Sequence, residues 1–430
     1  MNFRKIVKSF IPKKLFRSIE PYGHWSEAVL LNSLNRGSPA RTMKVIGVTG
    51  TNGKTTTCFL IHRMLHEAGY KVGLMTTAGY GAGNNIKPQI DHMTTVSVPK
   101  LIKRLEELKG QGVEWLVMET TSHALAQHRD AGIPYSVAVL TNITHEHLDY
   151  HGTFERYVAA KRMLFTRTNQ NKKGLQTGVV NADDGSAGQF VTSMKNSLTY
   201  GIDHGNLRAK NINLTAKGVS YKATVGDDSY QIKCHLPGKF NVYNSLAAIG
   251  VGRVLGLDKK AVEQGIAALP GVPGRMTAVD AGQNFNVLVD FAHSPDALEN
   301  VLRACRELTK GKLILVFGAT GDRDKLKRPV MGEVAAKNAD LIFLTDDETY
   351  TENPKTIIDA VNKGIERAKG KAKTTVIDSR LEAIRAAFSK AKDGDTVLLT
   401  GMGHLTTRNM GGKEEPWNEI EIAKKLLKTR

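Results

Sequence analysis

A glycine-rich loop near residue 50 has the composition of a phosphate site. It reads Gly47-Val-Thr-Gly-Thr-Asn-Gly-Lys-Thr-Thr56 and is followed by an apolar-periodic stretch. Glycines let backbone N–H groups close around a triphosphate, and a helix N-terminus adds partial positive charge. Lys54 would reach the β- and γ-phosphates, and Thr55 or Thr56 would bind Mg²⁺. The strict P-loop spacing fails because Val48 stands five residues before Gly53, so a chance Gly-rich turn is the alternative.

Polar side chains also follow two predicted strands. Glu119 ends one strand, and Thr141-Asn142 ends the next, before a run that contains His145, His147 and His151. The carboxyl ends of strands form the site in an open α/β sheet, so Glu119 is placed to hold Mg²⁺ near the loop. The three histidines suggest zinc as an alternative, but phosphate transfer needs the oxygen ligands that Mg²⁺ prefers.

Alternating strands and helices must position these residues. Such alternation predicts a parallel sheet with helices on both faces. The strands expected here are Lys44–Val48, Val72–Thr76, Trp115–Met118 and Val137–Leu140, and the helices are Thr55–Ala68, Leu101–Leu108 and Tyr157–Phe165. Alternating apolar residues predict antiparallel strands at Ser220–Val225 and Tyr230–His235, before helices Asn244–Leu255 and Lys259–Ala268.

A breaker cluster, Pro270-Gly-Val-Pro-Gly274, marks the expected domain boundary. A second alternation follows, with strands at Val287–Asp290, Leu313–Phe317, Leu341–Leu344 and Thr396–Leu399, and helices at Asp296–Leu308, Val330–Lys337, Thr356–Ala368 and Leu381–Ala391. We therefore expect an α/β protein. A basic amphipathic leader (1–42) precedes a central P-loop ATPase domain with a parallel sheet (43–270) and a C-terminal Rossmann-like α/β domain (271–430).

The charge of the chain is strongly positive, at +18 over 430 residues. The excess is diffuse, which is typical of a solvated surface, so we expect no specific nucleic-acid partner. Residues 1–17 hold six Lys or Arg and no acid, with apolar residues interleaved at near-helical spacing. This pattern predicts weak contact with an anionic membrane surface; a helix packed on the body is the alternative. Three scattered cysteines suit the cytoplasm.

Several segments together resemble the Mur ligase family, in that family's order. They are the loop at Gly50–Thr57, "ETTSHALAQHR" from Glu119, "TNITHEHLDYHGTFERYVAAKRMLF" from Thr141, "VDFAHSPDAL" from Val289 and "FGATGDRDKLKRPVMG" from Phe317. The resemblance covers residues 43–430. It implies a monomeric ATP-dependent ligase that forms an amide bond through an acyl phosphate. It further implies addition of the third, diamino, amino acid to UDP-N-acetylmuramoyl-dipeptide in peptidoglycan precursor synthesis.

The resemblance also implies roles for individual residues. The catalytic residues are Lys54, Glu119, Asn142, His147 and Lys161; the metal ligands are Thr55, Glu119, His147 and Lys161, with Lys161 carrying CO₂ as a carbamate. The ATP-binding residues are Gly50, Thr51, Asn52, Gly53, Lys54, Thr55, Thr56, Asn241, Asn244, Arg275, Asp290 and His293. The substrate-binding residues are Thr94, Thr95, Thr121, Ser122, Gln127, Arg129, Arg323, Asp347, Tyr350, Gly401 and Leu405.

Two features depart from the family pattern. Only about forty residues, a basic segment, precede the loop, where the family carries a domain for the UDP group, so either the leader does that work or the donor lacks UDP. The family's Asp-Asn-Pro-Arg reads Asp347-Glu-Thr-Tyr350 here, and its Gly-Lys-Gly-His-Glu reads Gly401-Met-Gly-His-Leu405. Loss of that Arg and Glu argues against meso-diaminopimelate and leaves L-lysine, ornithine or another acceptor open.

Two alternatives remain at this point. The first is a related ligase that acts on another carboxylate, as in folate polyglutamylation or polyamide synthesis. The second is an ATP-binding scaffold without ligase activity, although the presence of Lys54, Glu119, His147 and Lys161 argues against it.

Overall fold

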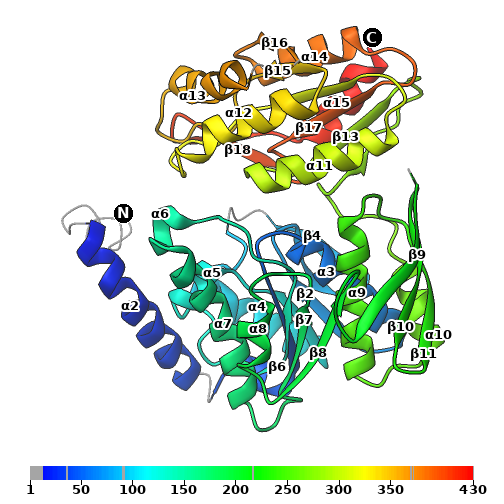
Figure 1. Ribbon diagram of the computed structural model, residues 1–430. Helices are drawn as coiled ribbons and strands as arrows, with labels where there is room; N and C mark the ends of the chain where they lie inside the picture. Colours follow the sequence, from blue (N-terminus) through cyan, green and yellow to red (C-terminus); the bar gives the residue numbers. More distant parts are fainter. Residues whose placement is uncertain are drawn as a thin grey trace.

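The computed structural model describes residues 13–34, 37–89, 93–215, 217–368, 370 and 372–429, and the side chains from residue 20 on. Two sheets, each covered by helices, form its two parts, one above the other in Figure 1. The first sheet ends at Cys234 and the second begins at Thr277. The α/β fold predicted from the sequence is confirmed.

The central sheet has 11 strands in the order β11-β10-β9-β8-β7-β6-β1-β5-β2-β3-β4. Its parallel part, from β2 to β8, contains β2 (Val72–Met75), β5 (Trp115–Glu119), β1 (Lys44–Thr49), β6 (Tyr135–Leu140), β7 (Thr177–Asn181) and β8 (Asn196–Gly201). On one side the antiparallel strands β3 (Gly79–Ala82) and β4 (Asn85–Pro88) extend the sheet. On the other side β9 (Leu207–Thr215) pairs in parallel with β8, and β10 (Gly218–Val225) and β11 (Asp228–Cys234) follow it as antiparallel strands.

Successive residues of the central strands face opposite cores, which explains why these strands read as continuous apolar runs. Ile46 and Val48 of β1 pack into one core with α3 (Lys54–Glu67), α9 (Phe240–Val254) and α10 (Lys259–Ala267). Val45 faces the other core, which is covered by α4 (Val98–Gly110), α5 (Ser122–Ala126), α7 (Phe154–Gln170) and α8 (Ala187–Val191). The short helices η1 (Pro39–Thr42) and α6 (Leu148–His151) complete this part.

The second sheet has six strands in the order β12-β13-β17-β14-β15-β16. They are β12 (Thr277–Ala278), β13 (Asn286–Asp290), β17 (Thr396–Thr400), β14 (Leu313–Phe317), β15 (Leu341–Leu344) and β16 (Lys373–Val376). One face carries α11 (Pro295–Leu308), α12 (Lys327–Asn338) and α13 (Pro354–Arg367), and the other carries α14 (Arg380–Lys390) and α15 (Glu419–Lys428). A hairpin of β18 (Thr407–Met410) and β19 (Lys413–Pro416) lies beside it. Arg380 and Glu419 form a fully buried ion pair between α14 and α15.

A long helix, α2 (Lys13–Leu34), lies against the central part, at the lower left of Figure 1. Ala28 is buried against Val98 and Ile102 of α4, so this helix packs on the body. The predicted membrane-binding segment, residues 1–17, falls on residues whose side chains, or whose whole structure, lie outside the described part. No helix of the described residues combines the length and apolar character needed to cross a bilayer.

Candidate active site

The glycine-rich loop joins the end of β1 to the start of α3, as the sequence predicts. Gly53 has φ +81°, and a Cβ there would lie 2.3 Å from Asn244 Oδ1, so only glycine fits this turn. Thr51 N donates to Asn142 O at 2.7 Å, and Asn52 N donates to Asn142 Oδ1 at 2.9 Å. Lys54 Nζ donates to Thr51 O at 2.7 Å. The end of β6 therefore holds the loop open at the N-terminus of α3, where anions bind.

Glu119 lies at the end of β5, directly beside this loop. Its side chain is 3% exposed, and its Oε2 accepts from Thr55 Oγ1 and Thr77 N, both at 2.9 Å. Arg275 Nη2 donates to the same Thr55 hydroxyl at 3.2 Å. Among the described residues, no lysine or arginine forms an ion pair with Glu119.

Lys161 lies on α7 beneath the loop and is buried. Its Nζ donates to Gly50 O at 2.6 Å and sits 4.6 Å from the centre of the Tyr157 ring. Burial, reinforced by the charge of Lys54, holds the pKa of this amine well below its usual range. A buried lysine with a lowered pKa has a larger fraction of the neutral, nucleophilic form.

Histidines and tyrosines cluster where β6 runs into α6. The His123 ring lies 4.6 Å from that of His147 and 4.3 Å from that of Tyr150, and His151 Nε2 lies 3.0 Å from Ser122 Oγ. His147 has φ +57°, a left-handed conformation that a non-glycine residue adopts at a cost. Burial and then the charge of Lys161 lower the pKa of His147 and of His151. Within the described chain, no group of three His, Cys, Asp or Glu side chains has a geometry that could hold a metal ion.

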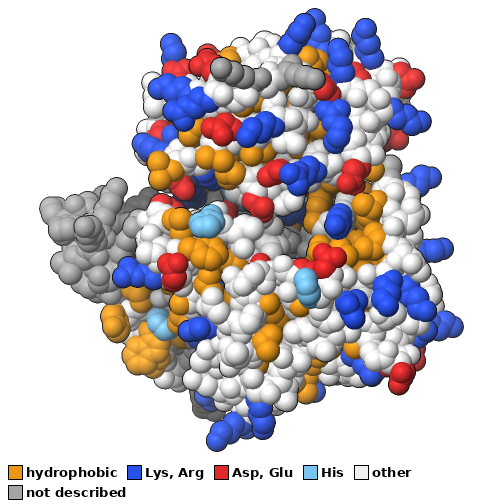
Figure 2. All heavy atoms as spheres, in the orientation of Figure 1, with side chains coloured by type: hydrophobic (Ala, Val, Ile, Leu, Met, Phe, Trp, Pro, Cys, Tyr) orange, Lys and Arg blue, Asp and Glu red, His pale blue; other side chains and the backbone are white. Residues whose placement is uncertain are grey.

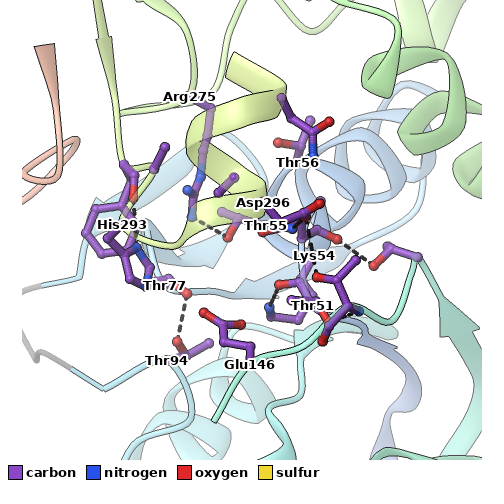
Figure 3. A pocket seen from close by; sticks show the side chains of 18 of the residues that line it. Thr51, Lys54, Thr55, Thr56, Thr77, Thr94, Glu146, Arg275, His293 and Asp296 are labelled. Carbon is purple, nitrogen blue, oxygen red and sulfur yellow. Dashed lines mark hydrogen bonds between the residues drawn. The ribbon is translucent and has the colours of Figure 1, made fainter. Parts of the chain in front are cut away.

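The C-terminal part closes over the loop through polar contacts. Asn52 Nδ2 donates to Asp296 Oδ2 of α11 in a short hydrogen bond, and Thr144 Oγ1 donates to the same oxygen at 3.4 Å. His404 Nε2 lies 2.9 Å from Thr77 O. Figure 3 shows Arg275, His293 and Asp296 pointing toward the space above Lys54 and Thr55. Figure 2 shows the hollow between the two parts, with charged side chains at its rim.

This hollow is a cavity of about 1330 Å³, and most of the predicted residues line it. They are Thr51, Asn52, Gly53, Lys54, Thr55, Thr56, Thr94, Glu119, Thr121, Gln127, Arg129, Asn142, His147, Asn241, Asn244, Arg275, Asp290, His293, Arg323, Tyr350, Gly401 and Leu405. Five predicted residues lie behind its wall: Gly50, Thr95, Ser122, Lys161 and Asp347. The roles predicted for these five stay predictions; Thr95, for example, donates from its Oγ1 to Glu119 O at 3.3 Å.

The two positions that depart from the family pattern, Tyr350 and Leu405, both line the cavity. The Arg323 guanidinium lies 5.2 Å from the centre of the Tyr350 ring, and Tyr350 Oη donates to Glu348 Oε2 at 3.4 Å. Gly401 has φ +107°, and a Cβ there would lie 2.1 Å from Asp347 Oδ2. Leu405 is buried and packs into the core beneath the second sheet.

Several lining residues were not predicted from the sequence. Four of them lie within the sequence segments that resemble the family, so the resemblance could have identified them: His123, Glu146, Asp296 and His404. Lys327 Nζ donates to His293 O at 2.8 Å, and Glu20 of α2 accepts from Gln127 Nε2 at 3.2 Å. Sequence spacing gave no reason to bring Glu20 to the cavity, because about 100 residues separate it from Gln127.

Comparison with known proteins agrees with this geometry. The Mur ligase middle domain matches residues 48–252, and the Mur ligase, glutamate ligase domain matches residues 274–403. A UDP-N-acetylmuramoyl-L-alanyl-D-glutamate--2,6-diaminopimelate ligase of Clostridium botulinum is 38% identical over 93% of this chain and 81% of its own length. The ligase of that name from Caldanaerobacter subterraneus is 40% identical over 91% of this chain and 79% of its own length.

A solved structure of a ligase with the same name superposes with a TM-score of 0.63. It is 29% identical and covers 96% of this chain and 83% of the solved chain. The resemblance read from the sequence and the prediction of a ligase are confirmed: this chain belongs to the Mur ligase family of ATP-dependent amide ligases.

Proposed function

We propose that this enzyme adds a diamino acid to UDP-N-acetylmuramoyl-L-alanyl-D-glutamate, at the expense of ATP, in the cytoplasm. The proposal rests on one observation: a single cavity is lined both by residues of the central part and by residues of the C-terminal part. They are Lys54, Thr55 and Glu119 on one side and Arg275 and Asp296 on the other. Two relatives, 38% and 40% identical, are ligases that act on this donor and a diamino acid by their names, which supports this donor and a diamino acceptor. Three cysteines that are free and buried support a reducing compartment.

Thr55 and Glu119 fit a Mg²⁺ ion. A buried carboxylate without a cationic partner is costly, and a hydroxyl and a carboxylate are the oxygen donors that Mg²⁺ takes beside substrate phosphates. When bound, the ion would neutralise charge on the transferred phosphoryl group.

Lys161 fits the role of a carbamate carrier. Reaction with CO₂ needs a neutral amine, which its burial favours, and the product would turn a cation into an anionic oxygen ligand. His147, which lines the cavity across from the loop, is proposed as the further ligand of a second Mg²⁺.

Chemistry in the cavity demands charge neutralisation and the exclusion of water. The donor carboxylate attacks the γ-phosphorus of ATP and ADP leaves; the acceptor amine then attacks the acyl carbon and phosphate leaves. Lys54 supplies a cation at the phosphates, and the loop N–H groups orient them. The contacts Asn52–Asp296 and Thr77–His404 hold the two parts together, which protects the acyl phosphate from hydrolysis.

The acceptor end of the cavity favours a distal amine over a distal carboxylate. Arg323 is available for the α-carboxylate, while Tyr350 stands where the family pattern has an Arg, and the Glu348 carboxylate lies beside its hydroxyl. A carboxylate at that place attracts an ammonium group and repels a second carboxylate. We therefore propose L-lysine or ornithine over meso-diaminopimelate, and we retain the monomeric state as part of the proposal.

Phosphate release tests both parts of the proposal. Purified enzyme with ATP, Mg²⁺ and the UDP-linked dipeptide should release phosphate only when an acceptor is added, and fastest with lysine or ornithine. If phosphate is released as fast with meso-diaminopimelate as with lysine, the acceptor proposal is refuted, but the donor proposal is not. Release that depends on no member of an amino-acid panel, or that needs a folate in place of the dipeptide, would refute the donor.

A further inference from the structure

The outward face of α2 is apolar and carries no charge. Within residues 20–34, the exposed positions are Tyr22, Gly23, Trp25, Ser26, Val29, Leu30, Ser33 and Leu34. They recur three and four residues apart and so form one continuous face of the helix. Tyr22 is 74% exposed, Leu30 61% and Leu34 71%. The solvent face of a surface helix is ordinarily polar and charged, so a face of this composition indicates a contact surface.

The charged side chains of α2 that the structure describes, from residue 20 on, lie on other sides of the helix. Glu20 hydrogen-bonds to Gln127 in the cavity wall, and His24 lies 3.9 Å from Glu20 and 3.7 Å from Glu27. Ala28 packs on α4. The helix is thus held to the body by one side while its apolar face stays free; Figure 2 shows orange side chains gathered over α2 at the lower left.

The chain that leads into this helix is strongly basic. Residues 1–17 contain Arg4, Lys5, Lys8, Lys13, Lys14 and Arg17 and no acid. An aromatic and aliphatic face preceded in the sequence by a cluster of cations matches the chemistry of an anionic bilayer surface, where Trp and Tyr sit at the headgroups and Lys and Arg meet lipid phosphates. A second copy of the chain meets this composition less well, since two basic segments brought together repel each other.

We propose that the outward face of α2, from Tyr22 to Leu34, docks this enzyme on an anionic lipid surface, with the helix lying in the plane of the interface. The proposal does not depend on which amino acid or donor the active site takes. It places the cavity, whose wall contains Glu20 on another side of the same helix, next to the membrane.

Co-sedimentation of the full chain with vesicles tests this proposal. Vesicles of phosphatidylglycerol and phosphatidylcholine should bind the enzyme, vesicles of phosphatidylcholine alone should bind it much less, and about 0.5 M salt should weaken binding. Tryptophan emission should shift to shorter wavelength on binding, and because Trp115 and Trp417 are buried, the shift reports Trp25.

A matched pair of double variants isolates the face. Val29→Ser with Leu30→Ser should weaken vesicle binding about tenfold or more, because it removes two exposed apolar side chains from the contact. Leu175→Ser with Val376→Ser, at exposed sites elsewhere, should bind like wild type. Both variants should release phosphate in solution at the wild-type rate, which shows that they fold.

Three results would overturn the proposal. The first is equal vesicle binding by both double variants. The second is equal binding to neutral and anionic vesicles. The third is a dimer in sedimentation velocity that the Val29→Ser/Leu30→Ser variant dissociates, which would assign the face to a second copy.

Discussion

Replacement of Glu119 by Gln should change stability and activity in opposite directions. The side chain is 3% exposed and accepts two hydrogen bonds from neutral donors, Thr55 Oγ1 and Thr77 N, at 2.9 Å. Gln keeps the size and one acceptor oxygen but removes a buried charge that no described cation pairs with. We expect the metal-free enzyme to gain about 1 kcal/mol in free energy of unfolding, because an unpaired buried charge opposes folding.

The same change should lower kcat by about 10²- to 10³-fold, the usual effect of removing one electrostatic contact to a transition state. Urea unfolding without Mg²⁺ measures the first effect, and phosphate release measures the second. Glu114→Gln is the matched control, since Glu114 precedes the same strand at its other end, is exposed and accepts from Lys71 N at 3.1 Å. A loss of stability by more than about 2 kcal/mol in Glu119→Gln would mean that the carboxylate is structural, and an unchanged kcat would remove it from the metal site.

Three further changes test other parts of the structure. Lys161→Ala should abolish turnover, and short-chain carboxylates should restore part of it, whereas Lys172→Ala on the exposed surface should be silent; full activity of Lys161→Ala would refute the carbamate. Arg380→Met should cost about 3 to 5 kcal/mol in urea unfolding, because it strands the fully buried Glu419, and Arg380→Met with Glu419→Leu should recover most of the loss; a cost below about 1 kcal/mol would contradict the pairing. Burial lowers the pKa of His62 to about 4, so the neutral form stabilises the fold above pH 6.5 and this stability is lost as pH falls toward 4. Between pH 6.5 and 4.5, the free energy of unfolding of His62→Leu should therefore fall by about 2 to 3 kcal/mol less than that of the wild type. Equal falls in the two proteins would contradict this role of His62.

The strands and helices that the sequence predicts are those with strong local patterns. The buried strand at Lys44 and the helix after the loop are present within a residue or two of the predicted ends. The β3–β4 hairpin was not predicted, because four-residue strands leave too little periodicity to detect. The antiparallel strands β10 and β11 were predicted, but their addition to the edge of the same central sheet depends on contacts that local pattern does not contain.

The site residues that lie in recognisable motifs could be predicted from the sequence. Contacts between segments far apart in the sequence could not. Lys54 and Glu119 follow from their places at strand ends, and the structure brings them together as expected. The resemblance implies that Lys161 is a metal ligand, and this stays a prediction; in the structure its Nζ donates to Gly50 O behind the cavity wall. Its distance from the cavity is set by how α7 packs under β1, which no spacing in the sequence determines.

The acceptor end shows how a residue change can carry a functional difference within an unchanged fold. Gly401 must stay glycine, because Asp347 Oδ2 would lie 2.1 Å from any Cβ there, so the turn that presents Leu405 is fixed by sterics. Tyr350 is fixed as well, by its φ of +48° and by Tyr350 N donating to Asn409 O at 3.1 Å. The backbone at Gly401 and Tyr350 is thus constrained, while the side chains of Tyr350 and Leu405 differ from the family pattern. Tyr350→Arg should therefore alter acceptor choice in favour of meso-diaminopimelate without unfolding the protein, since the added guanidinium can pair with a distal carboxylate. If the ratio of kcat/KM for diaminopimelate to that for lysine does not rise in this variant while its urea midpoint is unchanged, then Tyr350 does not select the acceptor.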